Sequence, residues 1–122
     1  MKIQQLTKAE EQVMQYLWQI NGGFVNDILE IMPEPKPHYN TVSTILKILV
    51  DKNFVAIKQL GKSNLYQPII HKDDYGKKNI QNILKGYYDD SFSKMLSFFA
   101  KEKKISIAEL ESILKDLKKD QL

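Results

Sequence analysis

The chain contains neither cysteine nor arginine in its 122 residues. The missing cysteine excludes disulfide bonds and thiolate metal sites. The missing arginine excludes the bidentate guanidinium contact that most often reads guanine in the DNA major groove. Any contact of this chain with a base would therefore come from lysine, a hydroxyl group, an amide or a bridging water.

Long apolar runs and enzyme motifs are also missing. No segment approaches the ~20 apolar residues that cross a bilayer, and the first residues form no continuous apolar run. We therefore expect no signal peptide, no membrane insertion and a cytoplasmic location. The sequence has no glycine-rich phosphate loop, no nucleophile motif and no histidines at metal-ligand spacing, so we expect no catalytic residue, no metal site and no cofactor.

The strongest pattern in the chain lies in residues 33–68. Apolar residues recur there at helical spacing from Asn40 to Val50, so they share one face of a predicted helix. The opposite face is short, hydrogen-bonding and without acid, as a helix that enters the DNA major groove requires. The apolar positions are Val42, Ile45, Leu46 and Leu49, and the polar ones are Asn40, Ser43, Thr44 and Lys47.

A change of period follows that helix. Apolar and polar residues alternate over 54–60, which predicts a strand, and a turn at 61–64 leads into a second predicted strand over 65–67. A helix followed at once by such a hairpin predicts the recognition helix and the wing of a winged helix-turn-helix.

Two more helices are expected before this segment. Thr7 and Glu10 match a capping box, which predicts a helix that runs to about residue 20. A second helix is expected near 25–32, and the prolines of 33–37 end it. The inward positions of the first helix are expected to be Leu6, Ala9, Val13, Leu17 and Ile20.

The helices that follow the hairpin are expected at 73–88, at 92–99 and from residue 107. We therefore predict a mostly α fold with two domains. Residues 1–70 form a winged-helix DNA-binding domain of three helices plus a β-hairpin wing, and residues 71–122 form a C-terminal three-helix dimerisation domain.

The C-terminal helices predict a homodimer. Three short helices rarely bury enough apolar surface to be stable alone, so a second copy of the chain is the simplest cover for them. A twofold dimer would place two recognition helices ~34 Å apart, which suits a pseudo-palindromic operator of double-stranded DNA. The candidate dimerisation residues are Phe92, Met95, Leu96, Phe99, Leu110, Leu114 and Leu117.

Positive charge gathers around the predicted recognition helix and wing. The net charge of the chain is only +3, but residues 36–62 hold five lysines and a single acid, Asp51. Such a local excess favours binding to phosphate groups. After residue 71, charges of both signs alternate, as on the solvated faces of helices.

Each candidate DNA contact has an ordinary alternative, because most polar residues on helices and hairpins are simply solvated. Near the helix N-terminus we expect phosphate contacts, since backbone amides there favour anions. Tyr39 contacts a sugar-phosphate or packs at the helix start. Ser43, Thr44 and Lys47 are candidates for base edges, and the wing lysines for phosphates. The full set is Tyr39, Asn40, Thr41, Ser43, Thr44, Lys47, Lys58 and Lys62.

Three segments, LTKAEEQVMQYLW, MPEPKPHYNTVSTILKILVDKNFV and GKSNLYQP, resemble the BlaI/MecI (penicillinase repressor) family of bacterial transcriptional regulators. The resemblance covers nearly the whole chain, including SKMLSFFAKEKKISIAELESIL. It implies a dimeric repressor that shuts off a β-lactamase or penicillin-binding-protein operon. It also implies a partner, a membrane-bound sensor metalloprotease, whose β-lactam signal leads to cleavage of the repressor in its dimerisation domain.

The resemblance places the family's cleaved Asn-Phe bond at Ser97 and Phe98, so the phenylalanine is kept and the asparagine is not. Relatives that respond to copper carry a C-terminal cysteine motif. The absence of cysteine here excludes a copper-release mechanism of that type.

Three other functions remain open from the residues alone. The winged helix could bind protein instead of DNA, in which case the polar helix face is neutral surface. It could belong to a regulator controlled by a small ligand bound between the domains. It could also bind DNA as a monomer.

Overall fold

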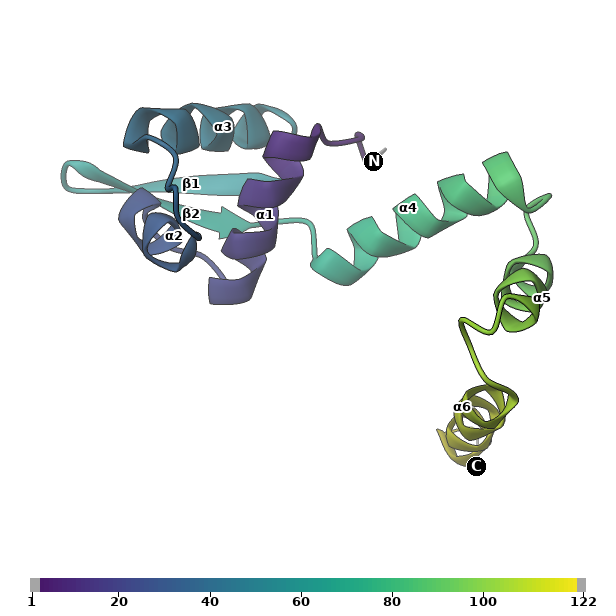
Figure 1. Cartoon of the computed structure of the whole chain (residues 1–122). Helices are drawn as coiled ribbons and strands as arrows, with labels where there is room; N and C mark the ends of the chain where they lie inside the picture. Colours follow the sequence, from purple (N-terminus) through teal and green to yellow (C-terminus); the bar gives the residue numbers. More distant parts are fainter. Residues whose placement is uncertain (1–2, 121–122) are drawn as a thin grey trace. The chain divides into compact units, whose positions relative to one another are not determined.

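The computed structural model describes residues 3–120, which form six helices and a two-stranded antiparallel hairpin (Figure 1). Their contacts divide the chain into two compact units, Met1–Lys77 and Lys78–Leu122. We call them the winged-helix unit and the C-terminal unit. The predicted mostly helical fold with a winged helix is confirmed.

The first helix, α1 (Lys8–Ile20), begins at the predicted capping box. The Thr7 hydroxyl accepts from the Glu10 amide at 3.3 Å, and the Glu10 carboxylate accepts from the Thr7 amide at 3.1 Å. The inward face differs from the prediction, since Ala9 is exposed whereas Glu10 and Met14 are buried. Glu10 turns inward because its carboxylate has partners there, which the apolar pattern alone does not reveal.

The second and third helices complete the helical layer of this unit. Helix α2 (Val25–Ile31) is short and buries Val25 and Ile28. Helix α3 (Tyr39–Asp51) begins and ends within a residue of the expected limits. Three of its four predicted apolar positions, Val42, Leu46 and Leu49, are completely buried.

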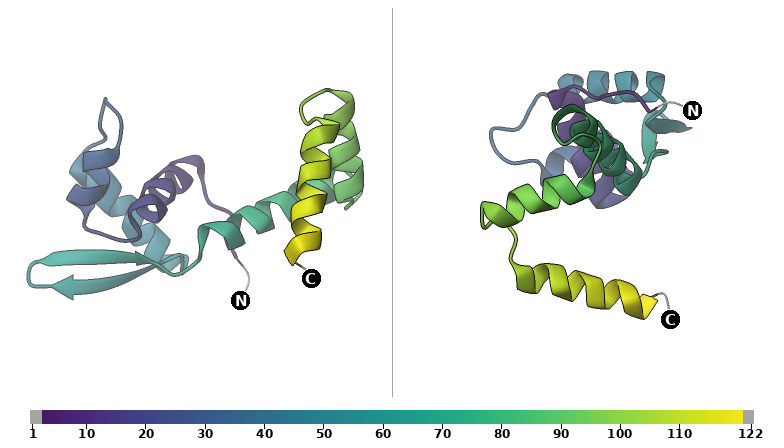
Figure 2. Two further views of the ribbon diagram at one scale, coloured as in Figure 1. Left: turned by 90° about the horizontal axis from the view of Figure 1, so that it is seen from below. Right: turned by 90° about the vertical axis from the view of Figure 1, so that its right-hand side faces the viewer.

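The wing consists of β1 (Val55–Leu60) and β2 (Ser63–Pro68), joined by the two residues Gly61 and Lys62. The predicted four-residue turn is wrong, because Ser63 pairs with Leu60 and so already belongs to the strand. The alternation over 54–60 also does not correspond to burial. After Val55 every residue of β1 is exposed, since the hairpin extends past the helices as a free ribbon (Figure 2, left).

The base of the wing is joined to the turn between α1 and α2. Gly23 and Tyr66 exchange two backbone hydrogen bonds of 2.9 Å each, and the Tyr66 side chain is buried. Phe54, just before β1, is completely buried in the same core. These contacts hold the wing to the helices at one end and leave its turn exposed.

The C-terminal unit is built differently. Helix α4 (Lys72–Tyr87) starts in the winged-helix unit and ends in the C-terminal one, and α5 (Phe92–Lys101) and α6 (Ile107–Asp120) follow. Asp89 and Asp90 precede α5 but do not cap it. They adopt positive φ in the turn before it, and Ser91 is the N-cap, accepting from the Lys94 amide.

Candidate nucleic-acid interface

The outer face of α3 presents hydrogen-bonding side chains without an acid between Tyr39 and Val50. Thr44 and Lys47 are exposed, whereas Ser43 is half-buried. The inner face is fixed by the buried leucines and valine, so the outer face has a defined direction. This geometry makes Thr44 and Lys47 the most accessible of the candidate base-reading residues.

The N-terminal end of α3 is open to solvent. Tyr39, Asn40 and Thr41 are all exposed, Tyr39 to 48%. His38 is the N-cap residue, but its side chain makes no capping hydrogen bond. The exposed first turn leaves backbone amides of the kind that bind phosphate oxygens.

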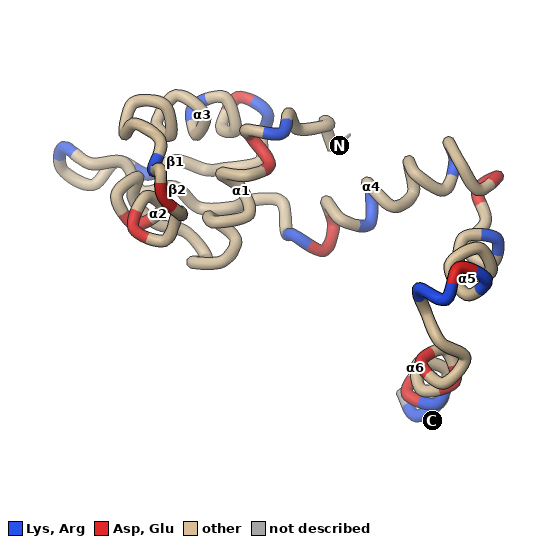
Figure 3. Tube along the Cα trace, in the orientation of Figure 1, with Lys and Arg blue, Asp and Glu red and all other residues tan. Residues whose placement is uncertain are grey.

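The turn of the wing lies at the same end of the unit as the start of α3 (Figure 1). Gly61 adopts φ 63°, a left-handed conformation that glycine tolerates without strain, and a Cβ at its position would meet no atom within 4 Å. Lys62 occupies the turn and Lys58 lies on β1, both exposed, and the lysine at the tip is visible in Figure 3. Positive charge is thus available beside α3.

Two of the five lysines in this region are engaged within the fold. The Lys36 ammonium donates to the carbonyls of Leu29 and Glu30 at the end of α2. Lys52 pairs with Glu10 at 2.5 Å. Among the described residues, Lys47, Lys58 and Lys62 have no ion pair, so these three are the lysines left for an anionic partner.

The pair between Glu10 and Lys52 connects the start of α1 to the end of α3. The two side chains are 8% and 22% exposed. Burial raises the pKa of Glu10, but the hydrogen bond and charge of Lys52, together with the hydrogen bonds of Thr7, lower the pKa by more, so it lies below its usual value. The carboxylate is therefore ionised at neutral pH, and it holds the C-terminal end of α3 in place.

Comparison with known proteins identifies the family of this chain. The family model for the penicillinase repressor matches residues 6–119. The chain belongs to the penicillinase repressor family. Members of this family are transcriptional repressors and not enzymes, so the predicted family and the predicted lack of catalysis are both confirmed.

Individual relatives are distant in sequence, and the two curated ones match nearly the whole chain. The methicillin resistance regulatory protein MecI of Staphylococcus aureus is 24% identical over 119 residues, 97% of each chain. The penicillinase repressor of Bacillus licheniformis is 26% identical over 121 residues, 96% of this chain and 94% of the relative. A solved structure of Bacillus licheniformis BlaI, in its monomeric form with the blaP half-operator, matches with a TM-score of 0.50 at 27% identity. That match covers 61% of this chain and 92% of the other.

The C-terminal unit of this penicillinase-repressor chain leaves the candidate dimerisation residues uncovered. Among its described residues only Leu84 is a buried hydrophobic side chain. Phe98 packs edge-on against Phe99 at 5.6 Å, and both lie near Tyr88. The candidate set divides into the exposed Phe92, Leu96, Leu114 and Leu117 and the half-buried Met95, Phe99 and Leu110.

Sequence reasoning missed one residue that completes the core of the winged-helix unit. Tyr75, in the first turns of α4, is 3% exposed and packs against Phe54 at 5.4 Å between ring centres. Its hydroxyl accepts from the Leu6 amide at 3.0 Å. A helix was expected over 73–88, but a tyrosine is ambiguous in a hydrophobic pattern, so the sequence did not indicate that Tyr75 is buried.

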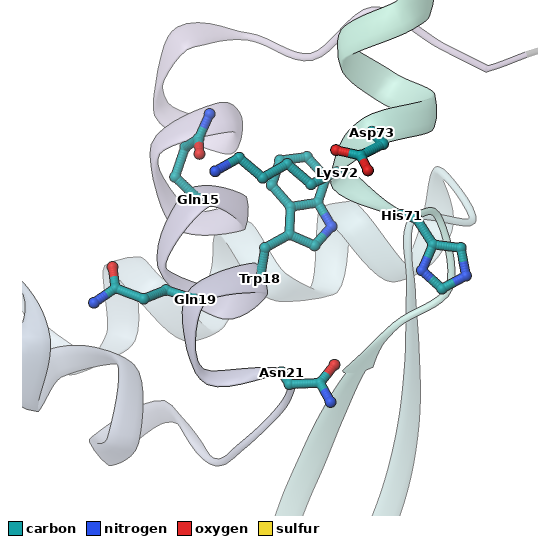
Figure 4. Close-up of a pocket in the computed structure, with 7 residues that line it drawn as sticks. All are labelled: Gln15, Trp18, Gln19, Asn21, His71, Lys72 and Asp73. Carbon is teal, nitrogen blue, oxygen red and sulfur yellow. The ribbon is translucent and has the colours of Figure 1, made fainter. Parts of the chain in front are cut away.

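A shallow pocket of about 500 Å³ lies on the winged-helix unit beside Trp18 (Figure 4). The lysine side chain of Lys72 extends along the indole ring toward Gln15, and His71 points away from it. The indole nitrogen already donates to the Ile70 carbonyl at 2.9 Å. No group of three metal-ligating side chains occurs in residues 3–120, and none of the helices described there is long and apolar enough to cross a membrane.

Proposed function

We propose that this chain is a dimeric repressor that binds a pseudo-palindromic operator, with α3 of each protomer in the major groove and each wing along the phosphate backbone. The observation that carries the proposal is the outer face of α3, which has no acid between Tyr39 and Val50 and which, together with the wing, carries three lysines without ion pairs in the described structure. A face of this kind offers hydrogen bonds to bases without repelling phosphates.

The relatives support the same function. The structural match to BlaI concerns a protein held in complex with half of an operator, and the curated relatives are named for penicillinase and methicillin resistance. We therefore expect the regulated genes to be those of a β-lactam response or a related operon. A dimer bound to an operator that overlaps a promoter would exclude RNA polymerase by occupancy.

The side chains divide into two roles. Thr44 and Lys47, with Ser43 at the edge of the exposed face, contact base edges and choose the sequence. A second group contacts the sugar-phosphate backbone of the DNA and sets the register. It consists of Tyr39, Asn40 and Thr41 at the helix start and of Lys58 and Lys62 in the wing. The first group governs which DNA is bound, and the second governs the dependence on salt.

Dimerisation multiplies the affinity. When one winged-helix unit is bound, the second meets its half-site at a high effective concentration, so the two sites together bind far more tightly than one. The support for a dimer is the apolar surface of the C-terminal unit, on which Phe92, Leu114 and Leu117 are all more than half exposed. A second copy would cover these side chains.

A gel-shift titration tests the proposal. The probes are the DNA upstream of the chain's own gene and of neighbouring genes, at two salt concentrations with competitor DNA. We expect competitor-resistant binding to a segment with two half-sites. Thr44→Ala should weaken that binding by ~1–3 kcal/mol and act unevenly among sequences, whereas Lys62→Ala should weaken all DNAs alike and reduce the salt slope by about one.

The two variants are controls for each other, because one removes a sequence-dependent contact and the other a uniform one. Weak binding that ignores sequence and vanishes with salt would reject operator recognition. Binding of a protein partner by the winged helix would then be the better-supported function.

Cleavage of the chain between Ser97 and Phe98 would release the repressor from its operator. Both residues are exposed on α5, a helix with no buried residue among those described. Local opening of such a helix costs little, so a protease gains access to the bond. The cut would separate residues 98–122 from the rest of the chain, and with them four of the seven candidate dimerisation residues.

Incubation with the sensor metalloprotease tests this step, with cleavage followed by mass spectrometry and DNA binding followed by gel shift. Ser97→Asn supplies the residue of the family's cleaved bond and should speed the cut. Ser93→Asn makes the same change at another exposed position of α5 and should not. An intact chain that has nevertheless lost DNA binding would disprove release by cleavage.

A further inference from the structure

The first turns of α4 are anchored in the core of the winged-helix unit. The Tyr75 ring packs edge-on against Phe54 and lies 6.0 Å from Trp18, between ring centres. Its hydroxyl accepts hydrogen bonds from the Leu6 amide and the Gln5 side chain. The start of α4 therefore moves with the recognition helix, because all of these groups belong to one compact unit.

The residue that follows this anchor is a glycine. Gly76 is exposed within the helix, and a Cβ at its position would meet no atom within 4 Å. Neither a close approach nor an unusual backbone angle requires glycine here. Compared with alanine, glycine disfavours the helix by about fivefold in its equilibrium constant, so α4 is weakened directly after its anchor. The division between the two compact units falls one residue later, after Lys77.

We propose that Gly76 is a hinge in α4, a positioning residue that sets how much variation in half-site spacing the repressor accepts. The inference rests on the proposed dimeric binding to two half-sites. Bending at glycine is a common cause of helix kinks. With bending at Gly76, each Tyr75-anchored recognition helix can adjust to its half-site while the dimer stays intact. With a stiff α4, only one spacing would allow both recognition helices to bind together.

The same helix supplies a matched control. Gly86 is also exposed and also has open space where a Cβ would lie, but it stands near the end of α4, far along the helix from the Tyr75 anchor. Gly86→Ala therefore makes the same chemical change, with a gain in helix stability that is at most as large because helix ends fray. Only its place in the helix differs.

The experiment measures affinity for four DNAs derived from the segment found by gel shift: a single half-site, both half-sites at natural spacing, and both with one base pair added or removed. We expect Gly76→Ala to bind the single half-site and the natural spacing as the unmodified chain does, or the latter up to fivefold more tightly. On the altered spacings it should lose at least about tenfold. Gly86→Ala should follow the unmodified chain on all four DNAs.

Hydrogen exchange provides a second readout that does not depend on DNA. Gly76→Ala should slow amide exchange in the first half of α4, and Gly86→Ala should slow it only near the helix end. Equal spacing profiles for the two alanine variants, or unchanged exchange around residue 76, would overturn the hinge. If the unmodified chain binds two half-sites no more tightly than one, the proposal of dimeric operator binding is wrong, and the hinge proposal, which rests on it, is wrong as well.

Discussion

The winged-helix unit buries its apolar residues in a core, whereas the C-terminal unit leaves most of its apolar residues exposed. In the first unit, side chains from α1 to α3, both strands and the start of α4 meet in one core, with Met14, Leu17, Leu46 and Phe54 all completely buried. In the second, only Leu84 is buried among the described hydrophobic residues. The difference indicates that the first unit is stable by its own packing, and it supports the proposed dimer, in which a second copy would cover the exposed apolar surface of the second unit.

The hydrogen bonds of the two units follow the same contrast. In the winged-helix unit, side chains connect segments far apart in sequence, such as Tyr75 to Leu6 and Trp18 to Ile70. In the C-terminal unit the side-chain bonds recorded are local, such as Lys94 to Asp89 five residues before it. Local bonds stabilise a helix or a turn, but they do not hold helices against one another.

The largest expected effect comes from placing a charge on the apolar side of α6. Leu114 is 55% exposed within the chain, so aspartate there should not unfold a protomer. In a dimer the residue occurs twice by symmetry, and about half of the 1.5–3 kcal/mol for full burial remains to be gained at each leucine. Loss of that term and the desolvation of two aspartate carboxylates together should weaken dimerisation of Leu114→Asp by about 3–6 kcal/mol. Analytical ultracentrifugation over a range of protein concentrations measures this loss.

Two controls separate the units in that experiment. Ser112→Asp adds the same charge at an exposed polar position of α6 and should leave the dimer intact. Leu49→Ala, in the buried core, should lower the free energy of unfolding by about 2–5 kcal/mol and leave dimerisation unchanged. The single tryptophan, Trp18, lies in the winged-helix unit and reports its unfolding by fluorescence. A dimer of normal strength with Leu114→Asp would show that this side of α6 is not the interface.

Periodicity predicted the helices of the winged-helix unit well because their tertiary contacts follow their apolar faces. Val42, Leu46 and Leu49 were expected inside α3 and are inside. The wing was placed correctly but its turn was too long, since Ser63 and Asn64 have turn-like composition yet pair with Leu60 and Gln59. Strand pairing decided these two residues, and the local sequence does not encode that pairing.

The polar contacts of the site were harder to predict. Residues 36–62 were treated as one basic segment. In the structure, however, Lys36 donates to a carbonyl at the end of α2 and Lys52 pairs with Glu10, so neither is available to DNA. Both partners are distant in sequence or are backbone carbonyls, so no spacing rule indicates them. The roles of the remaining residues in DNA binding stay predictions, as does the division of the chain into a DNA-binding and a dimerisation domain.

A smaller effect should come from the ion pair that closes the winged-helix unit. Glu10→Gln keeps the capping hydrogen bonds of the α1 start, since glutamine serves in a capping box, but it removes the charge that faces Lys52. Lys52 is partly exposed and can reach water, so we expect a loss of about 1–3 kcal/mol in unfolding free energy. Glu11→Gln, a neighbour without an ion pair in the described structure, should change little.

The dependence on pH distinguishes the lost ion pair from a general loss of packing. Since folding lowers the pKa of Glu10, its carboxylate stabilises the fold at every pH above the ordinary glutamate range, and this stabilisation disappears as the pH falls through the lowered value. The difference in stability between the unmodified chain and Glu10→Gln should therefore be largest near neutral pH and shrink toward acid. Urea denaturation followed by Trp18 fluorescence, from pH 7 down to about pH 3, measures it. A difference that stays constant over this range would mean that glutamine disturbs the packing of α1 against α3, and that the charge of Glu10 contributes nothing to holding the recognition helix.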